Sequence, residues 1–112
     1  MFEYSGKKLK TDFAERNFAY NIRTVLEDGD KAYVLLKIPF NDSRVDNLLC
    51  VNEHLAIVWD VQSLDEVYPN MNILPYEQVQ LKDGVLYATD FYGRCYLINA
   101  LDGTIKGKKI VK

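Results

Sequence analysis

The side chains that most often carry hydrolytic or metal chemistry are few in this chain and lie far apart. There is one histidine, His54, and there are two cysteines, Cys50 and Cys95. Cys95 and His54 belong to different predicted hairpins, so the spacing does not favour a nucleophile–base pair. The chain has neither a G-x-S-x-G elbow nor an H-E-x-x-H zinc sequence. Two cysteines and one distant histidine do not build the usual closed zinc site. We therefore predict no catalytic residues and no metal site.

Carboxylates gather in two short segments, "EDGD" at 27–30 and "NDSRVD" at 41–46. They could line a Ca²⁺ site if their loops converged, but neither has the spaced ligand set of an EF-hand, and we interpret them as solvated turns. Asp65, Glu66 and Asp90 are the residue types of a glycosidase pair, yet nothing in the sequence brings them together. The glycines stand singly, which leaves no Gly-rich phosphate loop. We expect no cofactor and a protein that is not an enzyme.

The charge balance argues against nucleic acid as a partner. The formal net charge is -2, so the chain has no basic excess for phosphate contacts. The C-terminal "KGKKIVK" is basic, and lysines at a chain end are typical of a solvated tail or of edge-strand protection. We expect no nucleic-acid partner.

The sequence points to the cytoplasm. The start, "MFEYSGKKLKTDF", lacks the apolar run of a signal peptide. No window approaches the roughly 18 apolar residues of a membrane span, so we expect no membrane partner. Cys50 and Cys95 lie in the apolar stretches "NLLCV" and "RCYLI". In a reducing compartment we expect them to be buried free thiols.

Aromatic residues are the features most typical of a binding surface. Aromatic and Arg side chains commonly anchor protein interfaces. The candidates lie at a strand end, in loops or at a turn tip: Trp59, Tyr68, Tyr76, Phe91 and Tyr92, with Asp90 and Arg94 flanking the last two. Each has a structural alternative. Trp59 can be core, the tip at 91–92 can fold back onto its sheet, and the two loop tyrosines, each next to a proline, can pack within the loop.

The elements that must position these residues are short strands joined by tight turns. Asp-Gly dipeptides, which tolerate the positive φ angles of tight hairpin turns, occur three times. Runs rich in Val, Ile, Leu and Tyr surround them. The predicted strands cover residues 20–27, 31–38, 45–52, 56–62, 77–81, 85–90, 94–100 and 104–111. Their spacing is that of an all-β fold.

Several of these strands are apolar on both faces, as "NLLCV" and "YVLLKI" show. A strand with one face in water alternates between apolar and polar residues, so both faces of the central strands must be covered. Either sheets wrap around each other as a sandwich or incomplete barrel, or a second copy of the chain covers one face.

Helix signals are few. Residues 11–20, "TDFAERNFAY", could form a short helical turn with Asp12 as cap and Glu15 three residues on; an irregular segment is the alternative. Residues 63–76 carry two prolines and two asparagines, which predicts the longest loop, with a single turn near 64–67.

The stretch "GVLYATDFYGRCYLINALDGTI" resembles a blade of the pyrroloquinoline-quinone (PQQ) and WD-type β-propeller repeats. The matching parts are Val85-Leu86-Tyr87, Thr89-Asp90, Gly93, Cys95 to Asn99 and Asp102-Gly103. "NLLCVNEHLAIVWDV" at 47–61 looks like the second half of another blade. From about residue 20 to 112, the chain is also similar to a family of small uncharacterised bacterial proteins with no established activity. That resemblance implies a fold and does not imply an activity.

Two departures from the repeat are visible. The turn "DFYGR" is one residue longer than the usual repeat turn and places Phe91 and Tyr92 at its tip. Leu55 stands where the repeat has its turn glycine, and because Leu is disfavoured at positive φ, we expect another turn shape there. Two such units cannot close a ring, so a central cofactor site of the propeller kind is not expected.

We therefore predict one all-β domain over residues 1–112. It would be an antiparallel hairpin meander, with propeller-blade-like small sheets or a sandwich, and about eight strands. We predict a non-enzymatic protein that binds an unknown protein partner through its aromatic loop surface, in the manner of an immunity protein. A small-ligand or carbohydrate-binding β module is the alternative, with Trp59 and the tyrosines as a stacking platform. A homodimer is a further expectation.

Overall fold

The structure is a computed structural model that describes residues 1–109. Three antiparallel sheets form in chain order. The N-terminal sheet has β1 (Glu3–Ser5), β2 (Lys8–Lys10) and β3 (Glu15–Asn17); the central sheet has β4 (Ile22–Asp28), β5 (Lys31–Leu36), β6 (Leu48–Asn52) and β7 (Ile57–Asp60). After a single-turn helix α1 (Leu64–Val67), the C-terminal sheet has β8 (Tyr76–Lys82), β9 (Val85–Asp90), β10 (Cys95–Asn99) and β11 (Ile105–Lys109). Within each sheet, consecutive strands pair as a meander.

The predicted all-β fold class is confirmed, and the number of strands needs correction. The eight predicted strands correspond to β4 to β11, although residues 110 and 111 of the last one lie outside the described residues. The structure adds β1 to β3, which makes eleven strands within residues 1–109. Each added strand has only three residues and most of its side chains are exposed, so it is too short for sequence reasoning to recognise an alternating pattern.

Of the two alternatives for residues 11–20, the helical turn is absent, and β3 occupies part of that segment. Thr11, rather than Asp12, organises the turn before β3. Its hydroxyl accepts hydrogen bonds from the backbone N–H groups of Phe13 and Ala14 and donates to the Glu53 carbonyl at 2.6 Å. The last contact ties the turn to a hairpin 42 residues away, so tertiary contact decides this segment.

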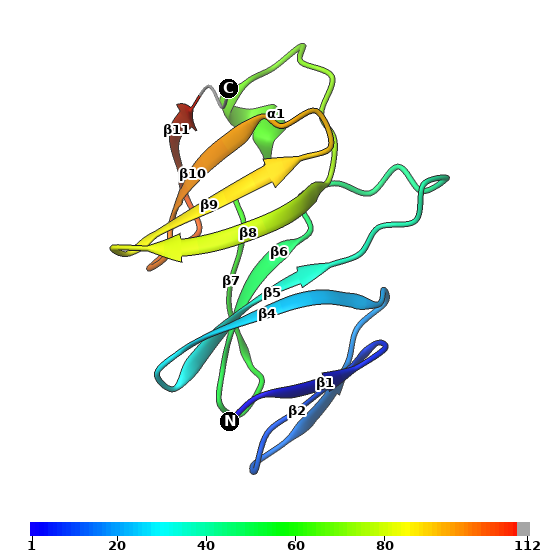
Figure 1. The fold of residues 1–112 in the computed structure, drawn as a ribbon, viewed down its shortest axis with the longest axis vertical. Coiled ribbons are helices and arrows are strands. Elements are labelled where there is room, and N and C mark those ends of the chain that lie inside the picture. Colours follow the sequence, from blue (N-terminus) through cyan, green and yellow to red (C-terminus); the bar gives the residue numbers. More distant parts are fainter. Residues whose placement is uncertain (110–112) are drawn as a thin grey trace.

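The central sheet is apolar on both faces because both are covered by the chain itself. Along β6, Leu48 and Cys50 face the C-terminal sheet, whereas Leu49 and Val51 face the N-terminal sheet. Figure 1 shows the order of the three sheets along the long axis, with the N-terminal sheet at the lower end and the C-terminal sheet at the upper end. Of the two expectations, sheets packed on each other account for this burial. Each buried aliphatic side chain contributes about 1.5–3 kcal/mol.

A buried asparagine links the central and C-terminal sheets. Asn47, only 1% exposed, precedes β6. Its Nδ2 donates to the carbonyls of Leu36 (2.6 Å) and Tyr76 (2.9 Å), and its Oδ1 accepts from the N–H of Tyr76 at 2.8 Å. The end of β5 and the start of β8 are thereby held together by one side chain.

Two local features of the loops can be compared with the sequence. The single turn expected near 64–67 is confirmed as α1, where the Ser63 side chain accepts from the N–H of Asp65 and Leu64 is buried. The expectation for Leu55 is wrong, because Leu55 does adopt a positive φ of 63°. Its side chain is buried at 2% exposure, and its carbonyl accepts from Arg16 Nη1. Burial worth about 1.5–3 kcal/mol offsets a backbone cost of about 1–2 kcal/mol.

Candidate functional site

The turn between β9 and β10, residues 90–94, is organised by one carboxylate. Asp90 is 4% exposed, and its Oδ1 accepts hydrogen bonds from the backbone N–H groups of Tyr92 and Arg94, both at 3.0 Å. Its Oδ2 accepts from Arg94 Nε at 2.7 Å. Gly93 adopts a φ of 83°, which favours glycine. We call residues 90–94 the aromatic turn.

The aromatic turn places its two aromatic side chains in solvent. Phe91 is 78% exposed and Tyr92 is 66% exposed. Their ring centroids are 5.9 Å apart and the ring planes meet at 61°, in an edge-to-face arrangement. The guanidinium of Arg94 lies 5.5 Å from the centroid of the Tyr92 ring. The tip does not fold back onto its own sheet.

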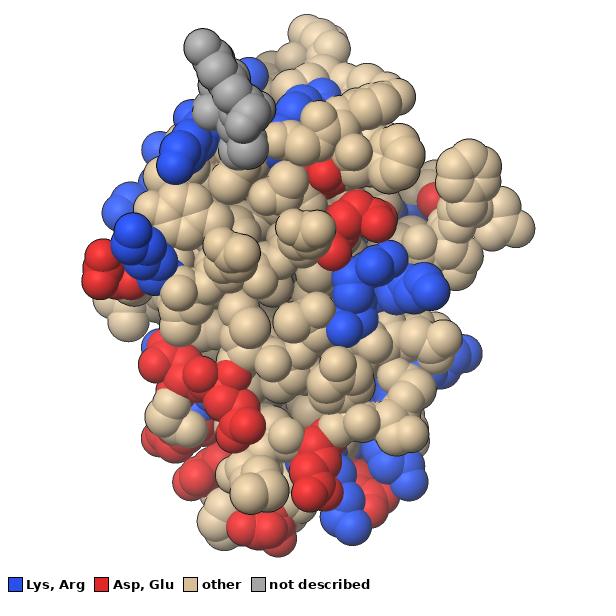
Figure 2. Space-filling model, in the orientation of Figure 1, with Lys and Arg blue, Asp and Glu red and all other residues tan. Residues whose placement is uncertain are grey.

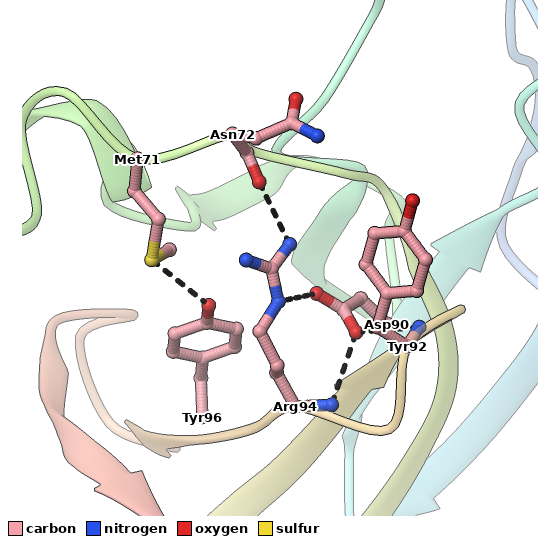
Figure 3. Close-up of polar contacts among 6 residues, drawn as sticks. All are labelled: Met71, Asn72, Asp90, Tyr92, Arg94 and Tyr96. Carbon is pink, nitrogen blue, oxygen red and sulfur yellow. Dashed lines mark hydrogen bonds and ion pairs between the residues drawn. The ribbon is translucent and has the colours of Figure 1, made fainter.

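Arg94 also connects the aromatic turn to the long loop that follows α1. Its Nη2 donates to the backbone carbonyl of Asn72 at 2.7 Å, as Figure 3 shows together with the Asp90 contacts. In the same loop, the Met71 sulfur accepts a hydrogen bond from the Tyr96 hydroxyl at 3.7 Å. One guanidinium therefore holds the turn, the Tyr92 ring and the loop in one arrangement.

Trp59 lies in the core. It is 8% exposed, and its Nε1 donates to the Ala100 carbonyl at 3.1 Å. Gly103, in the turn between β10 and β11, lies so close to the ring that a Cβ there would be 2.5 Å from Trp59 Cε3. The ring is enclosed by its own chain and has almost no surface to offer a partner.

Tyr76 and Tyr68 pack around the ring of Tyr96. Tyr76 is 1% exposed, its ring meets that of Tyr96 edge to face at 6.0 Å, and burial raises the pKa of its hydroxyl. Tyr68 is half-buried, 5.9 Å from the Tyr96 ring and 5.0 Å from Lys108 Nζ. Of the seven candidate residues, the structure gathers Asp90, Phe91, Tyr92 and Arg94 in the aromatic turn. Tyr76 pairs with Asp90 across β8 and β9 but is buried, and Trp59 and Tyr68 lie elsewhere.

Sequence reasoning missed Asn72, which contacts the turn from the long loop, and also Met71 and Asn47, which hold the neighbouring Tyr96 and Tyr76. Asn72 contributes only its backbone carbonyl, which no side-chain pattern could indicate. Met71 lies in the loop with little to distinguish it from its neighbours. Asn47 gave no signal either, because asparagine is common in loops.

Among the described residues, the side chains with catalytic potential are not paired with one another. Cys50 and Cys95 are buried free thiols, as predicted. Burial raises the pKa of the Cys50 thiol to about 11, which keeps it protonated and unreactive near neutral pH. His54 is exposed and its ring lies 4.7 Å from that of Phe13. Within residues 1–109, no group of three or more His, Cys, Asp or Glu side chains could hold a metal ion.

The aromatic turn is thus a preorganised, exposed pair of aromatic rings, an arrangement suited to contact with another molecule.

Across residues 1–109, no helix has the length and apolar character needed to cross a membrane. A search of curated proteins gives no match to this chain. Comparison with protein families gives a match over residues 1–110 to the family described as "Domain of unknown function (DUF7957)", which is not one of the PQQ or WD repeat families. Because this match spans nearly the whole sequence, the protein belongs to the DUF7957 family.

Proposed function

We propose that this protein is a non-enzymatic binding protein that contacts a protein partner through the aromatic turn. The observation that carries the proposal is the exposure of Phe91 (78%) and Tyr92 (66%) on a turn held by a buried carboxylate. Two adjacent aromatic side chains in water would gain free energy from burial against a partner. Aromatic residues are enriched at the energetic centres of protein interfaces.

The rigidity of the turn supports the proposal further. A flexible loop loses conformational freedom when it binds, and this loss weakens the complex. Here the backbone at Tyr92 and Arg94 is already fixed by Asp90, and Arg94 is fixed in turn by the Asn72 carbonyl. The turn therefore loses little conformational freedom when a partner buries the two rings.

We also propose a class of partner and a setting. By analogy with small bacterial β-proteins, the partner would be a toxin neutralised by an immunity-type contact in the cytoplasm. Two successive four-stranded meanders, β4 to β7 and β8 to β11, support a blade-like description of the chain. A toxin gene beside the gene for this protein would favour this class, and its absence would weaken it.

An affinity capture with matched variants tests the proposal. The wild-type protein is compared with a Phe91→Ala/Tyr92→Ala double variant and with Phe40→Ala, which removes a fully exposed aromatic from another loop. We expect one specific protein to be retained by the wild type and by Phe40→Ala and lost by the double variant. Equal capture by all three would contradict the role of the aromatic turn.

The alternative, a carbohydrate-binding platform built on Trp59 and the tyrosines, has less support, because Trp59 and Tyr76 are buried in the core.

A homodimer remains a proposal of its own. Sedimentation at increasing protein concentration tests it, and a mass that stays at 13.0 kDa would count against it.

A further inference from the structure

The free edges of the three sheets differ in how well they are protected against pairing with another strand. An edge strand presents unpaired N–H and C=O groups, and proteins protect such edges with lysines, short strands or bulges. β11 has lysines at 106, 108 and 109, β3 has only three residues, and β7 has four residues and a register shift opposite Cys50 and Val51. The edge of β4 is approached by the N-terminal sheet, where the Tyr4 hydroxyl donates to the Arg23 carbonyl.

β8 is the long edge strand that lacks such protection over most of its length. It has seven residues, its one paired neighbour among the described strands is β9, and its single lysine, Lys82, lies at the end. A register irregularity is confined to its beginning, between Tyr76 and Gln78. There the Arg23–Glu77 ion pair, at 3.4 Å, joins β4 to β8.

The backbone groups that β8 leaves unpaired follow from its hairpin. Asp83 and Gly84 have φ values of 51° and 77°, and they form a two-residue turn that pairs Lys82 with Val85. Hydrogen-bonded pairs alternate in an antiparallel ladder, so Lys82 and Gln80 direct their N–H and C=O groups to β9. Val79 and Leu81 therefore direct theirs away from β9, to the free edge.

A hollow of about 590 Å³ lies along this edge and reaches both sides of β8. On the side of the core it is lined by Leu26, Val79 and Leu81, and on the outer side by Lys82, Tyr87 and Lys109. Among residues 1–109, no carboxylate side chain lines it. Figure 2 shows Lys and Arg at the upper left, over β11, and in further groups at the right-hand side, whereas most acidic residues lie in the lower half.

We propose that β8 is a docking edge for an extended acidic segment of a partner protein, which would add as a fifth strand of the C-terminal sheet. Successive residues of a strand point to opposite sides. Apolar residues of the segment would contact Leu26 on one side, and alternate acidic residues would lie near Lys82 and Lys109 on the other. This edge is separate from the aromatic turn, so the inference does not depend on the function proposed above.

Synthetic peptides of about eight residues test the docking edge directly. One alternates Val and Glu, and a second alternates Val and Lys. Two further versions of the acidic peptide carry N-methyl groups on every second residue, either on the Val or on the Glu residues. Binding is measured by isothermal titration and by amide chemical shifts of the ¹⁵N-labelled full-length protein.

We expect saturable binding of the acidic peptide, with the largest shifts at the amides of Val79 and Leu81. The lysine peptide should bind at least about tenfold more weakly, because it meets two like charges. One of the two N-methylated peptides should lose binding and the other should keep it, since only alternate residues of an added strand donate to β8.

Charge variants test the proposal through side chains alone, because they leave the backbone groups of β8 unchanged. Lys82→Glu should weaken binding of the acidic peptide and strengthen binding of the lysine peptide. Because the Lys82 side chain is exposed, the variant should fold like the wild type. Lys106→Glu, at another exposed lysine on β11, should change the binding of neither peptide. The proposal is overturned by an absence of saturable binding, by equal binding of both N-methylated peptides, or by shifts confined to β7 or β11. Concentration-dependent shifts of Val79 and Leu81 without peptide would overturn it in favour of a second copy.

Discussion

Arg94 Nε lies 2.7 Å from Asp90 Oδ2, and the side chain of Asp90 is only 1% exposed. This ion pair joins the first and the last residue of the aromatic turn. The remaining Asp90 oxygen accepts the two backbone N–H groups of the turn, so one carboxylate determines how Phe91 and Tyr92 are presented.

Replacing Asp90 with Ala should destabilise the protein by about 3 kcal/mol, because it leaves a cation and two backbone donors without their acceptor. Urea unfolding followed by circular dichroism measures the change. Asp12→Ala, at an exposed position, is the control and should unfold like the wild type. Equal unfolding midpoints for Asp90→Ala and the control would show that the carboxylate does not hold the turn.

Removing the two exposed rings should leave stability almost unchanged. Phe91→Ala and Tyr92→Ala should each alter the free energy of unfolding by no more than about 0.5 kcal/mol, since surface side chains contribute little to folding. The same urea measurement decides this. A loss of more than about 2 kcal/mol would mean that the rings pack against their own sheet.

Gly103→Ala should be more damaging than an ordinary glycine substitution. The new Cβ would be 2.5 Å from Trp59 Cε3, in addition to the cost of a φ of 77°. Gly29→Ala, with a φ of 66° and no atom within 4 Å of the new Cβ, isolates the backbone cost of about 1–2 kcal/mol. We expect a larger loss for Gly103→Ala and a change in Trp59 fluorescence. Equal losses for the two variants would argue against the close packing.

Asn47→Ala should weaken the link between the central and C-terminal sheets. It removes three hydrogen bonds to Leu36 and Tyr76 in a buried place. The expected cost is about 2–4 kcal/mol, because the backbone groups left behind are unsatisfied. Asn72→Ala is the matched control, since the contact of Asn72 with Arg94 uses its carbonyl and survives the change. Thermal unfolding that does not distinguish the two variants would contradict this role of Asn47.

Alkaline pH should destabilise the protein partly through Cys50. Burial raises the pKa of this thiol from 9.0 to about 11. The folded state therefore holds the proton more tightly, so its contribution is complete below pH 9 and is lost as the pH rises to about 11. Cys50→Ala should show a shallower decline of stability than the wild type over that range, measured by urea unfolding at several pH values. Parallel declines would exclude a contribution from Cys50.

Much of the fold could be predicted because its signals are local. The Asp83-Gly84 step has the positive φ angles of a two-residue hairpin turn, and the apolar runs around it are long enough to identify strands. β1 to β3 could not be predicted, since their short strands carry mostly exposed side chains and are held in place by contacts such as that between Thr11 and Glu53.

The candidate site, too, could be predicted only in part. That aromatic and Arg residues gather at one turn was evident from "DFYGR". The all-β class was evident from the short apolar runs and the Asp-Gly turns between them. The burial of Trp59 and Tyr76 and the exposure of Phe91 and Tyr92 were decided by the tertiary structure. Local sequence determines turn angles and strand alternation, because these depend on neighbouring residues. Which aromatic rings remain in water depends on which sheet covers which face, and that follows from contacts between residues far apart in the chain.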